Sequence, residues 1–450
     1  MQEHDKKTLP SSPSKKRNQR DAPTRRQFFA QSLKSTLVWA APYFVPASAL
    51  AGAGRVGAND RIAVGYIGCG RRSAQLRNLP PDGQIVAAAD CHLGRARQVA
   101  AKYQARAYQD YRELLDSAAV DAVVVASPDH WHALHTIHAC QAGKDVYVEK
   151  PLSLTVAEGR LMVQAARANQ RVVQTGSQQR SMPTNVQACK LVREGALGKI
   201  RQVIAHNYPS PWFCNLPAQQ TPDELNWDMW CGPTELRPYH EDIYLPRAKP
   251  GWVSFQRWSG GEMTGWGAHG LDQVQLALGT SDTGPVEIWT EGPSFAPPTF
   301  DQPQGRSEAE RICSRPAIFM RYADGTLLTF GKGPPGGAIF IGERGRITIG
   351  RGTYHIEPEE LARSLPSIEA PLRESHLANW FACLRSRERP AADVEIGHRS
   401  ATLCHLGNIA RRAGRRLQWN PQQEKFVADA EANQWLSRTA RKGYELPQLL

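Results

Sequence analysis

Short apolar runs alternate with segments of helical spacing between residues 61 and 175, and this alternation constrains the fold more than any other feature. The apolar runs, rich in Val, Ile and Ala, lie at 61–67, 84–90, 121–126, 145–148 and 171–175. The segments of helical spacing lie at 93–103, 111–117, 132–142 and 156–168. Continuous apolar runs are typical of strands that are buried on both faces of a parallel sheet. The pattern therefore predicts βαβ units in a doubly wound α/β domain.

The first turn of this alternation is rich in glycine and reads Gly-Cys-Gly-Arg-Arg-Ser at 68–73. Gly68 permits a tight turn, Gly70 lets a pyrophosphate approach the backbone, and the small Ser73 lets the next helix pack on the sheet. The start of that helix would direct its N–H groups at the phosphates. We interpret the segment as a dinucleotide-binding turn, because it follows a strand and opens a helix. The residues expected to contact the dinucleotide here are Gly68, Cys69, Gly70, Arg71 and Arg72.

Asp90 stands at the end of the second expected strand, 20 residues after Gly70. An acid at this place accepts hydrogen bonds from the adenosine ribose of a dinucleotide. Its alternative role is to cap the helix expected at 93–103. We favour the ribose role and expect NAD as cofactor, because a carboxylate repels the 2′-phosphate of NADP. NADP is the alternative, since Arg71 and Arg72 lie close to the turn.

Two further strand ends carry polar residues, Ser-Pro-Asp-His-Trp-His at 127–132 and Glu-Lys-Pro at 149–151. Ligands of open parallel sheets bind at the carboxyl ends of strands, so both segments are expected beside the cofactor. Lys150 could be an ordinary surface lysine, but its place before a proline at a strand end favours the site. The residues expected to contact the cofactor here, with one residue after the last strand, are Ser127, Pro128, Asp129, His132, Glu149, Lys150 and Gln178.

The pattern changes beyond residue 180, where short strands are expected to pair through hairpins. These strands lie at 199–206, 317–322, 326–330, 338–342 and 346–349, and helices follow at 376–387 and 397–413. Turns at 323–325 and 343–345 favour antiparallel pairing, as in an α+β domain. We expect a dinucleotide-binding domain at 58–180, a second domain at 181–420 and a C-terminal tail at 421–450.

The first 51 residues have the layout of an export signal. A polar, Lys-rich stretch leads to Thr-Arg-Arg-Gln-Phe-Phe at 24–29, a moderately apolar run at 33–45 and small residues at 47–51. This resembles a twin-arginine signal peptide, which is removed after export of the folded protein. A membrane anchor is the alternative, but the run is shorter than the roughly 20 residues that span a bilayer. We expect a protein that is periplasmic or otherwise exported through the twin-arginine machinery and that has no stable membrane span.

The formal net charge of +12 raises the question of a nucleic-acid partner. Half of this charge lies in the first 49 residues, and the basic run at 411–416 is better explained as a solvated helix end. We therefore expect no nucleic acid. The nine cysteines contain no Cys-x-x-Cys pair, so neither a zinc site nor any other metal site is expected.

A segment at 260–272 reads Gly-Gly-Glu-Met-Thr-Gly-Trp-Gly-Ala-His-Gly-Leu-Asp. Together with the motifs at 68–73, 127–132 and 149–151, it resembles the glucose–fructose oxidoreductase / inositol dehydrogenase (Gfo/Idh/MocA) family over roughly residues 60–415. Residues 226–233, Asn-Trp-Asp-Met-Trp-Cys-Gly-Pro, are similar to the exported branch of that family. The resemblance implies a Rossmann α/β domain followed by an α+β domain with a mostly antiparallel open sheet. Since this sheet mediates oligomers in the family, a homo-oligomer is expected.

The resemblance also implies roles for individual residues. Lys150 would lie between nicotinamide and substrate, and His269 would handle the proton of the substrate hydroxyl, a step that suits a His of near-neutral pKa. His269 could instead merely pack at a helix start. Many dehydrogenases of the family have an Asp four residues before this His, where Gly265 stands here. Asp272 or Glu262 could supply the missing carboxylate, and Asp272 is expected to bind substrate.

Tryptophans are concentrated in the second half, where six of the twelve lie between residues 212 and 266. Aromatic faces pack on the C–H faces of sugars, which makes a carbohydrate substrate plausible, but large aromatics also fill cores. We expect packing roles for most of them and a substrate contact for Trp266. The six are Trp212, Trp227, Trp230, Trp252, Trp258 and Trp266.

An exported enzyme has no cytoplasmic NAD pool, so its cofactor should stay bound and be regenerated within the site. We therefore expect an NAD(P)-dependent oxidoreductase that transfers hydride from a sugar, sugar derivative or cyclitol and recycles its cofactor internally. One alternative is an NAD-dependent glycoside hydrolase that works by transient C3 oxidation and elimination. The other is a non-catalytic protein that binds saccharide.

Overall fold

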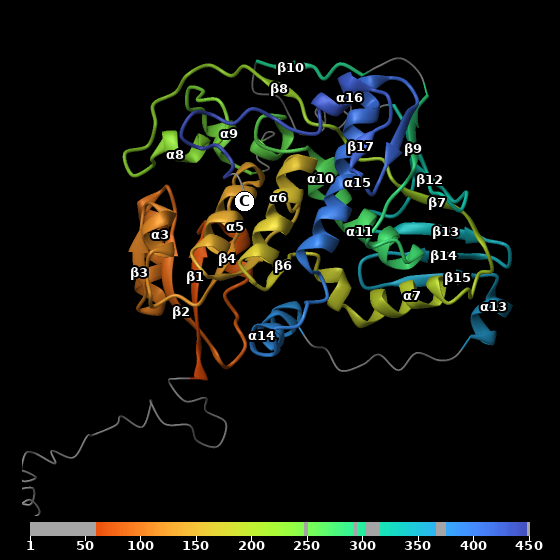
Figure 1. The fold of residues 1–450 in the computed structure, drawn as a ribbon, viewed down its shortest axis with the longest axis horizontal. Coiled ribbons are helices and arrows are strands. Elements are labelled where there is room, and N and C mark those ends of the chain that lie inside the picture. Colours follow the sequence, from red (N-terminus) through yellow and green to blue (C-terminus); the bar gives the residue numbers. More distant parts are fainter. Residues whose placement is uncertain (1–59, 247–250, 292–294, 302–315, 366–374, 448–450) are drawn as a thin grey trace, which may run out of the picture. The chain divides into compact units, whose positions relative to one another are not determined.

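The structure is a computed structural model that describes residues 60–246, 251–291, 295–301, 316–365 and 375–447 (Figure 1). The expected signal peptide at 1–51 lies outside the described residues. Among the helices that the structure describes, none combines the length and the apolar character needed to cross a membrane.

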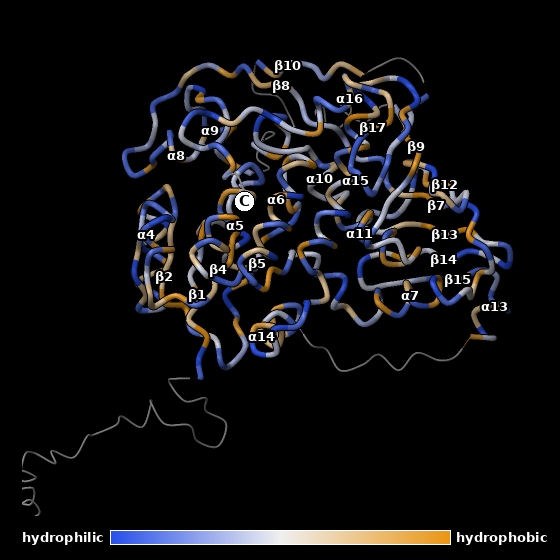
Figure 2. Tube along the Cα trace, in the orientation of Figure 1, coloured by the Kyte–Doolittle hydropathy of each residue, from blue (hydrophilic) through white to orange (hydrophobic). Residues whose placement is uncertain are grey.

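The first sheet is parallel, and its six strands follow the order β3-β2-β1-β4-β5-β6. They are β1 (Ile62–Ile67), β2 (Gly83–Ala89), β3 (Arg106–Tyr108), β4 (Ala122–Val125), β5 (Asp145–Val148) and β6 (Val173–Thr175). The buried strand β4 is entirely apolar, as its colour in Figure 2 shows. The chain order reverses between β1 and β4, where doubly wound sheets open a crevice for ligands. The prediction of a doubly wound parallel sheet is confirmed.

Helices pack on this sheet at the predicted places. They are α3 (Leu93–Tyr103), α4 (Tyr111–Leu115), α5 (His132–Gln141) and α6 (Val156–Ala168). A further helix, α14 (His376–Ser386), comes from a segment assigned by sequence to the second domain. Its fully buried Trp380 packs edge-on against Tyr147 of β5, with ring centroids 5.7 Å apart. One face of the Rossmann sheet is therefore completed by a segment more than two hundred residues away in sequence.

The second sheet has nine strands in the order β15-β14-β13-β7-β12-β11-β9-β16-β17. They are β7 (Ile200–His206), β9 (Glu287–Thr290), β11 (Ile318–Arg321), β12 (Leu327–Gly331), β13 (Ala338–Gly342), β14 (Arg346–Ile349), β15 (Tyr354–Glu357), β16 (Leu417–Asn420) and β17 (Lys425–Phe426). All neighbouring pairs are antiparallel except β7 and β12. The expected C-terminal tail holds β17 and α16 (Ala430–Gln434), so this segment adds secondary structure to the second domain.

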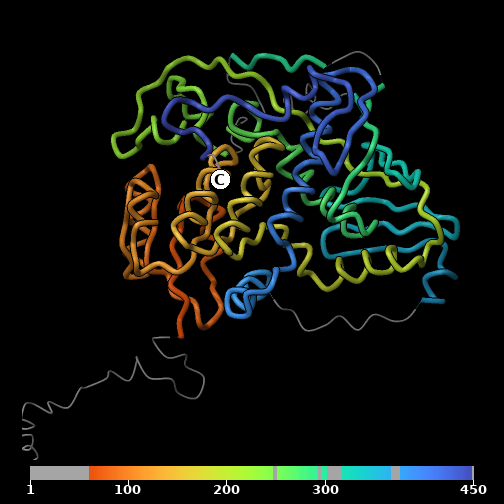
Figure 3. Tube along the Cα trace, in the orientation of Figure 1, coloured from red at the N-terminus to blue at the C-terminus, as the bar shows by residue number. Residues whose placement is uncertain are grey.

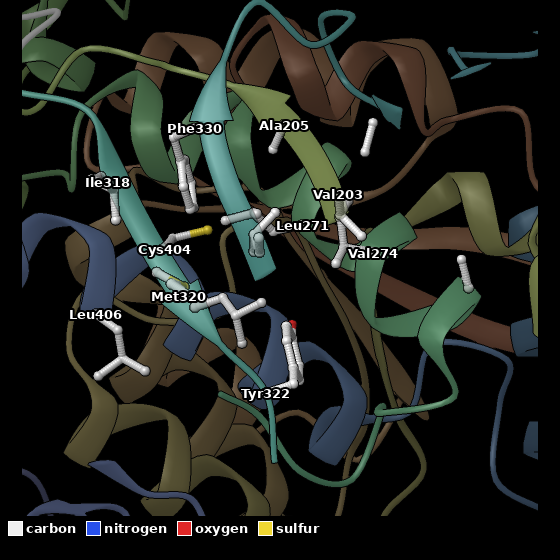
Figure 4. Packing of buried hydrophobic residues seen from close by; sticks show 14 of the residues in the cluster. Val203, Ala205, Leu271, Val274, Ile318, Met320, Tyr322, Phe330, Cys404 and Leu406 are labelled. Atoms are coloured by element: carbon white, nitrogen blue, oxygen red, sulfur yellow. The ribbon is translucent and has the colours of Figure 1, made fainter. Parts of the chain in front are cut away.

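Three helices contribute to the core on one face of the second sheet: α7 (Pro183–Arg193), α11 (Gly267–Leu278) and α15 (Val394–Ala413). The alternating burial of β7 explains the arrangement, because Val203 and Ala205 point into the core while their neighbours are only partly covered. Figure 4 shows these two residues among Leu271 of α11 and Phe330 of β12. Helix α11 is thereby fixed with its first turn close to the Rossmann domain.

Residues 212–246, here called the roof segment, run above the Rossmann domain (Figure 3). Met229, Trp230 and Tyr244 of this segment line the cavity at the carboxyl ends of the Rossmann strands. The segment contains α8 (Trp227–Cys231) and α9 (Glu241–Tyr244). Two backbone hydrogen bonds join it to the loop after β2: the Leu93 N–H donates to the Glu224 carbonyl at 3.0 Å, and the Asn226 N–H donates to the Cys91 carbonyl at 2.9 Å. A segment that follows the Rossmann domain in sequence is thus held against the loop after β2.

The C-terminal stretch, residues 435–447, fastens the roof segment to the Rossmann domain. The Arg438 guanidinium donates to the Glu158 carboxylate at 2.7 Å and to the His130 carbonyl at 3.1 Å. The Arg441 guanidinium donates to the Asp228 carboxylate of α8 at 2.6 Å. These contacts hold three separate parts of the chain together above the crevice.

Candidate active site

A cavity of about 840 Å³ lies at the carboxyl ends of the Rossmann strands, beneath the roof segment and beside the first turn of α11. Fifteen of the sixteen residues predicted for the site line it, and the exception is Asp272. The fifteen are Gly68, Cys69, Gly70, Arg71, Arg72, Asp90, Ser127, Pro128, Asp129, His132, Glu149, Lys150, Gln178, Trp266 and His269. The cavity therefore brings together residues from both domains.

The glycine turn has the shape that a dinucleotide needs. Gly68 adopts φ +89°, and a Cβ there would lie 2.7 Å from the Ser127 nitrogen, so only glycine fits. A Cβ at Gly70 would meet no atom within 4 Å, which leaves the backbone open to a diphosphate. The following helix α2 (Arg71–Gln75) has only five residues. Its first two residues, Arg71 and Arg72, place positively charged side chains next to the turn. These residues fit the phosphates of NAD.

Asp90 is held between the glycine turn and the loop after β2. One carboxylate oxygen accepts a hydrogen bond from the Cys69 N–H at 2.7 Å, and the other accepts from the His92 N–H at 2.8 Å. The N-cap residue of α3 is His92, so Asp90 does not have the capping role that was its alternative. Its carboxylate lies in the cavity wall, where an acid binds ribose hydroxyls.

Glu149 and Lys150 extend from the end of β5 in different directions. The Glu149 carboxylate pairs with the Arg72 guanidinium at 2.7 Å. Burial alone would lower the pKa of Arg72, but this carboxylate raises it above its usual range. The Lys150 ammonium instead donates to the Gly265 carbonyl of α10 (Glu262–Gly265) at 3.0 Å. Lys150 therefore reaches from the Rossmann sheet to the second domain.

The segment at 127–132 joins the loops around the crevice. The His132 ring nitrogens lie 2.7 Å from the Pro151 carbonyl and 2.9 Å from the Ser127 carbonyl. The Asp129 carboxylate accepts a hydrogen bond from the Ser259 hydroxyl at 2.7 Å. His132 and Asp129 are both buried, so they form part of the wall that supports the cavity.

His269 lies on the first turn of α11 and is only 8% exposed. The Trp266 ring stands edge-on to it, with centroids 5.8 Å apart. Arg351, in the turn between β14 and β15, also lies close to His269, and its place there was not predicted from the sequence. Its guanidinium lies 3.5 Å from His269 Nε2, and another of its nitrogens donates to the Gln178 amide oxygen at 3.4 Å. A guanidinium can only donate, so this contact is a hydrogen bond only in the tautomer whose Nε2 carries a lone pair.

Asp272 does not line the cavity, which corrects the expectation that it binds substrate. Its side chain is 1% exposed and accepts hydrogen bonds from the Arg180 guanidinium at 2.8 Å and the Ser400 hydroxyl at 2.7 Å. Arg180 belongs to the 3₁₀ turn Gln178–Ser181 after the last Rossmann strand. Asp272 thus anchors α11 to the end of the first domain, three residues beyond His269.

Four of the six tryptophans, Trp212, Trp227, Trp230 and Trp258, are buried, and Trp230, Trp252 and Trp266 line the cavity. Trp227 and Trp230 stack at 4.4 Å inside the roof segment, and Trp258 is fully buried beside them. Trp266 is 38% exposed and lines the cavity next to His269. An aromatic face is therefore available at the end of the cavity that His269 lines. Within the described residues, no cluster of three or more His, Cys, Asp or Glu side chains is placed to hold a metal ion.

Comparison with curated proteins finds relatives among the inositol 2-dehydrogenases. That of Rubrobacter xylanophilus is 35% identical over 147 residues, which cover 32% of this chain and 42% of the relative. That of Acidothermus cellulolyticus is 31% identical over 206 residues, or 43% of this chain and 60% of the relative. The chain thus spans about half the length of the curated relatives it matches.

Solved structures share the fold at lower identity. The aldose-aldose oxidoreductase from Caulobacter crescentus, complexed with glycerol, has a TM-score of 0.55 at 17% identity, covering 80% of this chain and 99% of that one. The WlbA dehydrogenase from Bordetella pertussis, in complex with NADH and UDP-GlcNAcA, has the same TM-score and coverage at 18% identity.

Two family models divide the chain at the boundary between the sheets. Residues 62–177 match the oxidoreductase family's NAD-binding Rossmann fold, and residues 182–446 match its C-terminal alpha/beta domain. Together they cover almost all of the described residues. The chain therefore belongs to the Gfo/Idh/MocA oxidoreductase family, and its first domain is an NAD-binding Rossmann fold.

Proposed function

We propose that the protein is an NAD-dependent oxidoreductase that removes hydride from a sugar, sugar derivative or cyclitol. One observation carries the proposal: Lys150 and His269, from different domains, line the same cavity as the dinucleotide turn around Gly68. The names of the inositol 2-dehydrogenase relatives support a polyhydroxylated substrate.

The chain's own groups can perform the proton chemistry of such a reaction. Bound NAD⁺ supplies a hydride acceptor. His269, with a lone pair at Nε2, can accept the proton of a substrate hydroxyl, and the Lys150 ammonium can stabilise the alkoxide that remains. Trp266 offers an apolar face to the C–H side of the ring. Met229, Trp230 and Tyr244 of the roof segment cover part of the cavity.

We further propose that the protein is exported to the periplasm by the twin-arginine machinery with its cofactor bound. The layout of residues 1–51 supports export. The backbone hydrogen bonds between the roof segment and the loop after β2 support slow release of the nucleotide. A bound cofactor that cannot exchange must be returned to its oxidised state in place, by reduction of a second carbonyl compound.

One observation favours a second candidate function. Gly265 stands where many dehydrogenases of the family have an Asp, so no carboxylate is supplied from that position. Lys150 binds the backbone carbonyl of Gly265 instead. A glycosidase that oxidises C3 transiently and then eliminates the glycosidic bond would reduce its product again, and its net reaction would be redox-neutral.

The experiment is to purify the full chain with its native cofactor and to follow absorbance near 340 nm on addition of sugars, cyclitols and glycosides. A dehydrogenase gives a reduced cofactor and, in steady state, matched amounts of oxidised and reduced products. A glycosidase gives hydrolysis with solvent deuterium at C2 of the product. Sugar binding with neither signal would indicate a binding protein.

Two variants and a control test the assigned roles. His269→Ala and Lys150→Met should each lower turnover about 100-fold or more, in line with the loss of a proton-transfer group or an alkoxide partner, and should keep the cofactor bound. Lys190→Met removes an exposed lysine of α7 and should leave turnover unchanged. Near-normal turnover in His269→Ala would refute the proposal.

A further inference from the structure

Arg351 brings a second cation to the catalytic end of the cavity, and a buried residue fixes its position. It lies in a Gly-Arg-Gly turn between β14 and β15. The Asn185 side chain, fully buried in α7, donates to the Gly350 carbonyl at 2.7 Å and accepts from the Gly352 N–H at 2.8 Å. Both flanks of Arg351 are therefore held by one side chain, which points to a defined role for the guanidinium.

The charges that line the cavity are unequal. Its described lining contains three carboxylates and five Lys or Arg side chains; these are Asp90, Asp129 and Glu149, and Arg71, Arg72, Arg95, Lys150 and Arg351. Arg71 and Arg72 begin the helix after the dinucleotide turn, and Arg95 lies over the Tyr244 ring at 4.7 Å in the roof. The diphosphate of NAD accounts for positive charge near the turn.

Lys150 and Arg351 contribute two positive charges to the cavity that His269 also lines, and Arg351 lies 3.5 Å from His269 Nε2. Gly265 supplies a carbonyl there and no carboxylate. Burial and the neighbouring Arg72 cation lower the pKa of Arg351, and the Glu149 carboxylate opposes this effect in part. A site of this kind is stabilised when an anion enters it.

We infer that the substrate is a sugar acid whose carboxylate binds the Arg351 guanidinium. The inference rests on the proposed function and narrows its substrate class. Arg351 presents a planar fork of donors that matches a carboxylate, and His269 lies 3.5 Å away, so a uronate bound there would hold its ring hydroxyls near the catalytic groups.

The test is calorimetric titration of the NAD-loaded full chain with matched pairs of sugars: D-glucuronate with D-glucose, and D-galacturonate with D-galactose. A uronate should bind at least about tenfold more tightly than its neutral partner, the expected effect of a charge-assisted hydrogen bond. Arg351→Gln should remove most of this preference. The control Arg363→Gln, in α13 (Glu359–Ser364) and paired on the surface with Glu359, should retain it.

Equal affinity for both members of each pair, including binding too weak to measure for both, would overturn the inference. So would an Arg351→Gln variant that keeps the preference, or one that loses affinity for NAD⁺ instead, because Arg351 would then serve the cofactor. Reduction of bound NAD⁺ by neutral sugars alone would overturn the inference and leave the proposed function standing. Uronate preference without any cofactor reduction would refute the function alone.

Discussion

The Lys150 ammonium donates a hydrogen bond to the Gly265 carbonyl over 3.0 Å. This contact joins the end of a Rossmann strand to the short helix before His269. This carbonyl dipole orients the ammonium without adding a negative charge, whereas a carboxylate at position 265 would add one. Glycine at position 265 therefore leaves the part of the cavity near Lys150 more positive than an aspartate there would.

Gly265→Asp tests this electrostatic effect directly. Gly265 lies in a helical turn, so a side chain is compatible with its backbone. The new carboxylate should neutralise Lys150 and reduce the ratio of uronate to neutral-sugar affinity by about tenfold, or roughly 1.4 kcal/mol. Gly265→Asn adds a side chain of the same shape without charge and should leave the ratio near the wild-type value. An equal change in both variants would attribute the effect to sterics.

Asp90→Asn should weaken discrimination between the two nicotinamide cofactors. The amide oxygen can still accept from the Cys69 N–H, but the negative charge that repels a 2′-phosphate is lost. The ratio of Kd for NADP⁺ to Kd for NAD⁺ should fall about tenfold, roughly 1.4 kcal/mol, in equilibrium binding measurements. Asp116→Asn, at an exposed position after α4, serves as the matched control. An unchanged ratio in Asp90→Asn would show that other groups select the cofactor.

Asp272→Ala should lower stability and leave substrate affinity intact. Removal of this carboxylate leaves the buried Arg180 guanidinium without its ion-pair partner. Such a loss typically lowers the free energy of unfolding by about 3–5 kcal/mol. Denaturant unfolding measures the loss, and substrate titration below the unfolding transition measures affinity. The double variant Arg180→Met with Asp272→Leu should recover part of the stability, because no unpaired charge remains. Weaker substrate binding at unchanged stability would restore Asp272 to the substrate site.

His405 should make the protein less stable as the pH falls from 6.5 towards 4. Burial, with a smaller effect from His398, lowers the pKa of His405 to about 4, so the folded chain keeps this ring neutral while the unfolded chain protonates it. Its contribution is complete above pH 6.5 and lost as the pH falls to 4, in total about 3 kcal/mol. His405→Asn does not titrate and should flatten the slope of unfolding free energy against pH. An equally steep slope would assign the acid sensitivity to other groups.

The order of elements in the Rossmann domain could be predicted because its signal is local. Apolar runs and helical spacing located β1, β2, β4, β5 and β6 to within two residues. The strand β3 was missed, since three residues that begin with an exposed Arg106 give no apolar run. The docking of α14 on the Rossmann sheet was also missed, because amphipathic spacing marks a buried face and not the surface that covers it.

In the candidate site, too, the residues next to recognisable strands could be predicted, and those positioned by packing between distant segments could not. The glycine turn and Lys150 follow recognisable strands, so their place at the sheet edge could be inferred. The position of Arg351 could not be inferred, because the sequence of a Gly-Arg-Gly turn does not show which distant segment packs against it. The Arg180–Asp272 pair depends on how α11 packs against the end of the first domain, and this packing decided that Asp272 points away from the cavity.

The bonds made by Arg438 and Arg441 have a consequence for biosynthesis. These two residues lie more than 370 residues after β1, yet they secure the cover of a chamber whose floor begins near residue 62. The ribosome must therefore synthesise the chain through Arg441 before both bonds can form. A product that stops before Arg438 would lack them, and we expect it to hold the nucleotide less tightly.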